Sequence, residues 1–138
     1  MYSFGKRSKE ALNTCHPDLQ TVLHRVIQHM DFSVIEGLRT TEKQQEYYDN
    51  GKSQLDGINR LSWHQDRFGD GFSRAVDIVP FADGKQQWED YGLYRRLAKL
   101  MFNEWQELLK LGRVNHRLEW GGMWVSFLDM PHYQIKPV

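Results

Sequence analysis

The segment Phe127-Leu128-Asp129-Met130-Pro131-His132-Tyr133-Gln134-Ile135 is the part of the chain around which the predicted fold is organised. Residues from His132 to Ile135 alternate in polarity, which predicts a β-strand. Pro131 suits the start of such a strand because proline cannot continue a helix. We therefore expect Asp129 on a constrained turn and His132 on a fixed strand, close enough to share a small ligand.

The composition favours one domain with a packed core, because 40% of the 138 residues are apolar and 13% aromatic. Eighteen basic residues balance eighteen acidic ones, so we expect no basic surface of the kind that binds nucleic acid. No stretch approaches the roughly eighteen apolar residues of a membrane span, and the start lacks the apolar core of a signal peptide. The single Cys15 excludes an intramolecular disulfide and a cysteine-rich zinc site, so a metal would need His and carboxylate.

Periodicity predicts helices and strands in mixed order. Pro17 opens an amphipathic helix, and Thr41 and Gln44 have capping-box spacing for a second helix that Gly51 ends. The pattern predicts an α+β fold, a single domain over 1–138 with helices packed on a small antiparallel sheet. The predicted helices cover about 17–30, 41–50 and 87–111, with a short helical turn at 8–12; the predicted strands cover 32–38, 74–80, 117–120 and 132–135, with turns at 81–85 and 121–122.

Asp77 is the clearest local conflict in the sequence, because it is an acidic residue in the middle of the β-rich run from 74 to 80. A lone carboxylate there is costly to bury unless it is paired or bound to a metal, and such conflicts cluster at functional sites. His64, in the long loop 52–73, and His132 are the histidines that can join it. Two histidines, one carboxylate and an open fourth position are a common catalytic zinc arrangement.

Two further residues complete this hypothesis. Asp129 would act as general base for a water molecule at the metal, and Arg39, between a predicted strand and helix, could stabilise an oxyanion. An ordinary surface role for Arg39 stays open, and scattered His and Asp residues also occur by chance. His116 is the alternative ligand if His64 fails. Asp66 and Asp70 could bind a second cation, although we expect solvated loop acids there.

The ordered motifs Ser62-Trp63-His64, Ala75-Val76-Asp77 and Asp129-Met130-Pro131-His132 resemble the signature of D-Ala-D-Ala carboxypeptidase/dipeptidase-like zinc metallopeptidases. Within that group, the chain looks most like the L-alanyl-D-glutamate endopeptidases that bacteriophages use as endolysins. The resemblance implies His64, Asp77 and His132 as zinc ligands and Asp129 as catalytic base; Arg39 and Ser62 would contact the substrate or the transition state. The likeness covers almost the whole chain, and its other matching segments are 4–8, 16–19, 32–40 and 120–122.

The chain departs from the family pattern at two places. The usual first motif is Ser-x-His-x-x-Gly-x-Ala-x-Asp, whereas thirteen positions separate His64 from Asp77 here and Ser73 takes the place of the glycine. We expect an insertion of about six residues to loop out after His64, at modest cost because closure entropy grows slowly with loop length. Met123 stands where these enzymes commonly carry an acidic residue.

The resemblance implies a zinc-dependent endopeptidase that cleaves peptidoglycan stem peptides at the L-Ala-D-Glu bond. A D,D-carboxypeptidase or dipeptidase acting on terminal D-Ala and a non-catalytic cell-wall-binding module are the alternatives. The expected partner is bacterial peptidoglycan, with no nucleic acid, no stable membrane association and a monomeric state. The absence of a signal peptide fits a phage lysin that is made in the host cytoplasm and reaches the cell wall at lysis through a separate pore protein.

Overall fold

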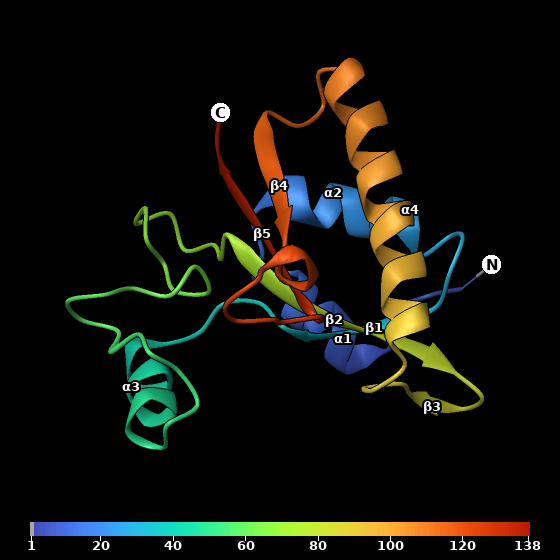
Figure 1. Ribbon diagram of the computed structural model, residues 1–138. Coiled ribbons are helices and arrows are strands. Elements are labelled where there is room, and N and C mark those ends of the chain that lie inside the picture. The colour runs from blue at the N-terminus through green and yellow to red at the C-terminus, as the bar shows by residue number, and fades with distance from the viewer. Residues whose placement is uncertain (1) are drawn as a thin grey trace.

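The computed structural model describes residues 2–138 and shows helices around an antiparallel sheet (Figure 1). The strands lie in the order β1-β2-β5-β4, and a short β3 pairs with the far end of β2. This architecture confirms the predicted α+β class. The helices are α1 (Lys6–Leu12), α2 (Pro17–Val26), α3 (Thr41–Asp49) and α4 (Tyr91–Lys110), and η1 (Gly121–Met123) is a 3-10 turn; the strands are β1 (Phe32–Glu36), β2 (Ala75–Ala82), β3 (Lys85–Gln86), β4 (His116–Trp120) and β5 (His132–Pro137).

The core lies where α2 and α4 pack on each other and against the sheet. Val76 and Ile78 of β2 are fully buried, and Asp77 between them points to the opposite face because side chains alternate along a strand. Helix α3 belongs to a separate lobe, formed with the long loop that follows it (Figure 1). The core thus supports β2 and β5 from one side and leaves Asp77 facing the lobe side.

Several helix boundaries differ from the predicted ones because capping residues set them. Helix α4 begins at Tyr91, later than predicted, since the Asp90 side chain accepts the amide of Leu93. The predicted capping box from Thr41 to Gln44 is wrong: Thr40 is the N-cap and accepts the amide of Lys43. Gln44 is fully buried and bonds to other side chains.

The predicted turn at 81–85 is partly wrong, because it is the tip of a hairpin. Strand β2 continues to Ala82, and β3 begins at Lys85. Asp83 and Gly84 form the two-residue connection, with φ of 55° and 76°. Positive φ at both positions is typical of the hairpin turns that Asp-Gly favours. No helix within residues 2–138 is long and apolar enough to cross a membrane.

Candidate metal centre

Three of the predicted residues meet on the two central strands of the sheet, β2 and β5, and the long loop. Antiparallel pairing of β2 and β5 sets Asp77 directly opposite His132, and His64 reaches them from the long loop. His64 Nε2 lies 3.2 Å from Asp77 Oδ1 and 3.2 Å from His132 Nδ1, and His132 Nδ1 lies 3.2 Å from Asp77 Oδ1. The three atoms therefore form a nearly equilateral triangle.

This triangle fits a tetrahedral metal ion. Metal–ligand distances of about 2.0 Å place the ligand atoms of a tetrahedral zinc site about 3.3 Å apart, close to the spacing observed here. Two imidazole nitrogens and one carboxylate oxygen are also ligands that zinc accepts. The three residues can therefore hold a metal and leave a fourth position for substrate or water.

Hydrogen bonds on the far sides of the two rings fix which nitrogen faces the triangle. His64 Nδ1 donates to the carbonyl oxygen of Gly37 at 2.8 Å, so its Nε2 carries the lone pair. His132 Nε2 donates to Gln134 Oε1 at 2.7 Å, and Gln134 Nε2 in turn donates to Glu119 Oε1 at 3.0 Å. Such partners orient metal-binding histidines and raise their basicity. The two rings therefore present different nitrogens to the triangle, Nε2 of His64 and Nδ1 of His132, and these are the atoms that a metal would contact.

The electrostatics of the triangle concentrate negative charge on Asp77. Burial alone would raise the pKa of the Asp77 carboxyl, but the imidazoles of His64 and His132 outweigh burial and hold it well below its usual range. Burial alone would lower the pKa of His132, but the hydrogen bond and charge of Asp77 raise it above the usual value.

The long loop 52–73 positions His64 beside Asp77 and His132 despite its added length. The Arg39 amide donates to the His64 carbonyl at 2.8 Å, and the Arg74 amide donates to the Trp63 carbonyl at 3.2 Å. The chain thus leaves after His64 and returns beside it at Arg74, with the added residues looped outward. Asp70, in the outer part, forms an ion pair with Arg74. This path agrees with the insertion that we expected to loop out after His64.

Asp129 lines the same pocket as His64, Asp77 and His132, and the segment Trp120-Gly121-Gly122 fixes its position. The Asp129 amide donates to the Gly121 carbonyl at 3.0 Å, and Trp120 Nε1 donates to the Met130 carbonyl at 2.8 Å. A Cβ on Gly121 would lie 2.2 Å from the Asp129 carbonyl oxygen, so only glycine permits this approach. Burial raises the pKa of Asp129, which strengthens it as a proton acceptor.

Arg39 and Ser62 also line this pocket. The Arg39 guanidinium donates to the Glu36 carboxylate and to Gln44 Oε1, and it stacks 4.5 Å over the ring of Tyr47. Ser62 Oγ accepts the amide of His64 at 3.1 Å. Arg39 is therefore held rigidly by side chains, while Ser62 shapes the turn that carries His64.

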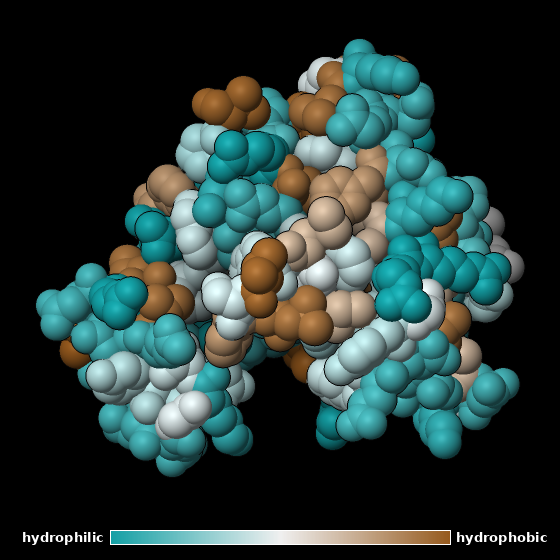
Figure 2. Space-filling view, viewed as in Figure 1, coloured by the Kyte–Doolittle hydropathy of each residue, from teal (hydrophilic) through white to brown (hydrophobic). Residues whose placement is uncertain are grey.

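The pocket around these residues encloses about 210 Å³. Figure 2 shows hydrophobic side chains gathered near the middle of the visible face, over the segment between η1 and β5. Met123, Val125, Phe127 and Leu128 are the exposed hydrophobic residues of that segment, and Phe127 also lines the pocket. A larger hollow of about 690 Å³ runs along β1 and contains none of the predicted site residues.

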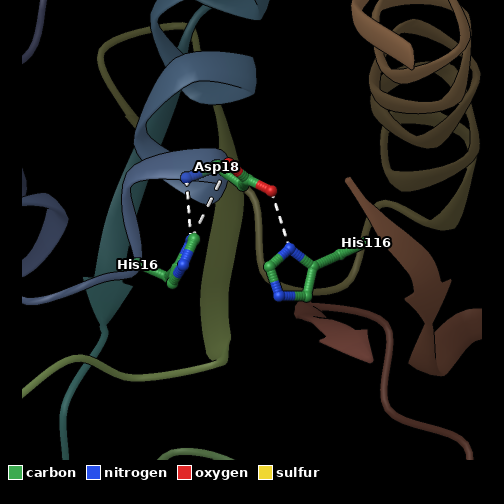
Figure 3. A group of neighbouring side chains, drawn as sticks. All are labelled: His16, Asp18 and His116. Atoms are coloured by element: carbon green, nitrogen blue, oxygen red, sulfur yellow. Dashed lines mark hydrogen bonds and ion pairs between the residues drawn. The ribbon is translucent and has the colours of Figure 1, made fainter. Parts of the chain in front are cut away.

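His116, the alternative ligand, lies in a different cluster with His16 and Asp18 (Figure 3). Its Nδ1 donates to Asp18 Oδ2 at 2.6 Å, shorter than the edge of a tetrahedral metal site. His16 Nδ1 accepts the Asp18 amide at 3.0 Å and caps α2. These contacts form a hydrogen-bonded connection between α2 and β4. His64, not His116, lies beside Asp77 and His132.

The groups that orient the rings of His64 and His132 were not predicted from the sequence. Gln134 stands two positions after His132, on the same face of β5 by the strand period, so its contact could have been foreseen. The Gly37 carbonyl could not, because it depends on how β1 leads into the loop beside His64. Gly121 was singled out only as part of a family motif, and the sequence did not show that it packs against the backbone of Asp129.

The fold and this site define a small α+β domain with a two-histidine, one-carboxylate centre of the type found in metal-dependent hydrolases. The model of the phage L-alanyl-D-glutamate peptidase family matches residues 1–134, and the chain belongs to that family. It is 30% identical over 137 residues to the L-alanyl-D-glutamate peptidase of Escherichia phage T5, covering 98% of this chain and 90% of that protein.

A solved structure is also similar. The crystal structure of the L-Ala D-Glu endopeptidase ChiX of Serratia marcescens superposes with a TM-score of 0.73 at 31% identity. The match covers 96% of this chain and 89% of that chain. Both relatives therefore match the chain over nearly its whole length.

Proposed function

We propose that this protein is a zinc-dependent phage endolysin that hydrolyses the L-Ala-D-Glu bond of peptidoglycan stem peptides. The observation that carries the proposal is the triangle of His64, Asp77 and His132, with edges of 3.2 Å, beside Asp129 in one pocket. Membership of the phage L-alanyl-D-glutamate peptidase family and the names of both relatives support the bond and the substrate.

The chemistry follows from the groups that line the pocket. Zinc bound there would polarise the scissile carbonyl and lower the pKa of a water molecule at the site to about 7. Asp129 accepts a proton from the attacking water and returns it to the leaving amine. Arg39 keeps N–H groups on Nη1 and Nη2 that have no partner within residues 2–138 and can donate to the developing oxyanion.

The proposal is tested on purified Gram-negative sacculi. Zinc-loaded protein is expected to release new amino termini, identified as glutamate by end-group labelling, and Asp129→Ala protein is expected to release none. Release of free alanine alone would instead support the D,D-carboxypeptidase. No new termini from zinc-loaded protein, together with sacculus binding, would support the non-catalytic module.

A second arm tests the metal. Protein stripped with a chelator is expected to lose activity and to recover it when one equivalent of zinc is added. Full activity in the stripped protein, with metal analysis showing none bound, would contradict zinc dependence while leaving the peptidase assignment in place.

A further inference from the structure

The pocket that holds the metal ligands continues into a second pocket along the segment 52–60. The second pocket encloses about 160 Å³ and shares Ser53 and Phe127 with the first. The two pockets therefore form one groove, with Asp77 and Asp129 at its inner end and Arg60 at its outer end. A peptide lying across the metal centre can extend along this groove.

The wall of the groove is held in place by Gln44. Gln44 Nε2 donates to Ser53 Oγ at 2.9 Å and to the Leu55 carbonyl at 2.7 Å, while its Oε1 accepts from Arg39. Gly57, at φ +83°, packs so closely that a Cβ would lie 3.0 Å from Gln44 Cγ. These contacts hold the segment 52–60 against α3 and Arg39, and so they fix where its side chains lie.

The groove carries two cations that the fold does not neutralise. Lys52 lines the inner pocket and Arg60 the outer one, both are exposed, and within residues 2–138 neither has a carboxylate within 4 Å of its charged nitrogens. Asp56, the acidic residue of the segment 52–60, accepts the amides of residues 58, 59 and 60 at its Oδ1.

Arg39 differs from these two because Glu36 already neutralises it. No acidic residue lines the outer pocket. The outer groove therefore has a net positive charge that is available to a ligand.

We propose that Lys52 and Arg60 bind the free carboxylate of the substrate's acidic residue, so that the groove selects acidic stem peptides over amidated ones. This inference rests on the proposed function. A glutamyl residue in a peptide chain uses one carboxyl group for the next bond and keeps the other as a carboxylate unless it is amidated. Lys52 lines the same pocket as Asp77 and Asp129, and Arg60 lines the adjoining pocket, so a carboxylate next to the scissile bond can reach both cations along the groove.

The test compares two soluble peptides that differ only at this group, one with L-Ala-D-Glu and one with L-Ala-D-isoglutamine. Wild-type protein is expected to show kcat/KM for the acidic peptide on the order of tenfold higher, since each exposed ion pair contributes up to about fivefold. This ratio is expected to approach one in the Lys52→Gln/Arg60→Gln variant. It is also expected to shrink at high salt, which screens exposed charges.

A matched variant, Lys99→Gln/Arg113→Gln, removes two exposed cations outside the groove and is expected to keep the wild-type ratio. Equal turnover of both peptides by wild-type protein would leave the proposed function standing and overturn this inference. An unchanged ratio in the Lys52→Gln/Arg60→Gln variant would overturn it as well. Turnover of neither peptide would defeat the proposed function, and the inference would fall with it.

Discussion

Asp129 and His132 stand three positions apart, yet their surroundings suit them to different tasks. His132 is tied to Gln134 on one side and faces Asp77 on the other, so its free nitrogen points at the triangle. Asp129 lines the pocket and, within residues 2–138, no side-chain hydrogen bond engages its carboxylate. One residue is placed to hold a metal and the other to accept a proton.

Replacing Asp129 with Asn should separate these tasks. An amide cannot accept the proton, so kcat is expected to fall by about 10²–10⁴-fold, while metal analysis still finds one zinc per chain. His132→Ala is expected to lose both activity and zinc. Wild-type turnover in the Asp129→Asn protein would exclude Asp129 as the base.

The hydrogen bond from His132 to Gln134 should contribute to metal affinity. Gln134→Leu removes the acceptor, and zinc affinity is expected to fall by about 10–100-fold in competition with a chromophoric chelator. The double variant Gln134→Glu/Glu119→Gln keeps an acceptor for His132 and a donor–acceptor contact between the two side chains, so it should retain most of the affinity. Equal affinity in the Leu variant and the wild type would show that this contact does not matter.

At the scale of elements, the turn from η1 to β5 depends on two glycines. Gly121 lies against the backbone of Asp129, and a Cβ on Gly122 would lie 2.2 Å from the ring of Trp120. The turn that carries Asp129, the proposed base, therefore needs glycine at both positions of the motif Trp120-Gly121-Gly122 in order to pack.

Gly121→Ala should displace Asp129 without touching the ligand triangle directly. A shift of about 1 Å in a catalytic group can cost about 10²-fold in rate, so we expect kcat to fall by that order while thermal unfolding shows a folded protein. Gly5→Ala is the matched control, because nothing lies within 4 Å of a Cβ at that position. If both variants keep wild-type kcat, the turn does not position the base.

Most elements were predictable because their signals are local. The strand after Pro131 and the stop of α3 before Gly51 follow from single residues. Strand β3 was missed because two residues carry no period, and Thr40 was missed as the cap of α3 because Gln44 also matched a cap motif. Residue types alone made His64 a candidate to join Asp77, and the family resemblance strengthened that prediction, since the intervening loop has no periodicity to place His64.

At the scale of the molecule, the contacts among His64, Asp77 and His132 join the long loop to strands β2 and β5. A bound zinc would therefore stabilise the whole fold by mass action. At a free zinc concentration one hundred times the dissociation constant, the gain in unfolding free energy is about 2.7 kcal/mol. Thermal unfolding with zinc and with chelator measures this difference, which His132→Ala should abolish.

This stabilisation should increase with pH. In zinc-free protein the raised pKa of His132 contributes stability that is fully present below about pH 6.5 and is lost as pH rises through the folded-state pKa. Zinc needs neutral imidazoles, so its affinity rises over the same range. The difference in melting temperature between zinc-loaded and zinc-free protein should widen from about pH 6 to pH 8. A constant difference would mean that His132 does not lose a proton to solvent when the metal binds.

We propose above all that one zinc ion binds His64, Asp77 and His132 together. An anomalous-scattering map of zinc-loaded crystals, recorded at the zinc edge, tests it most directly. We predict a single strong peak about 2.0–2.2 Å from His64 Nε2, Asp77 Oδ1 and His132 Nδ1. A peak at the cluster of His16, Asp18 and His116, or one that contacts fewer than three of the predicted ligands, would contradict the claim.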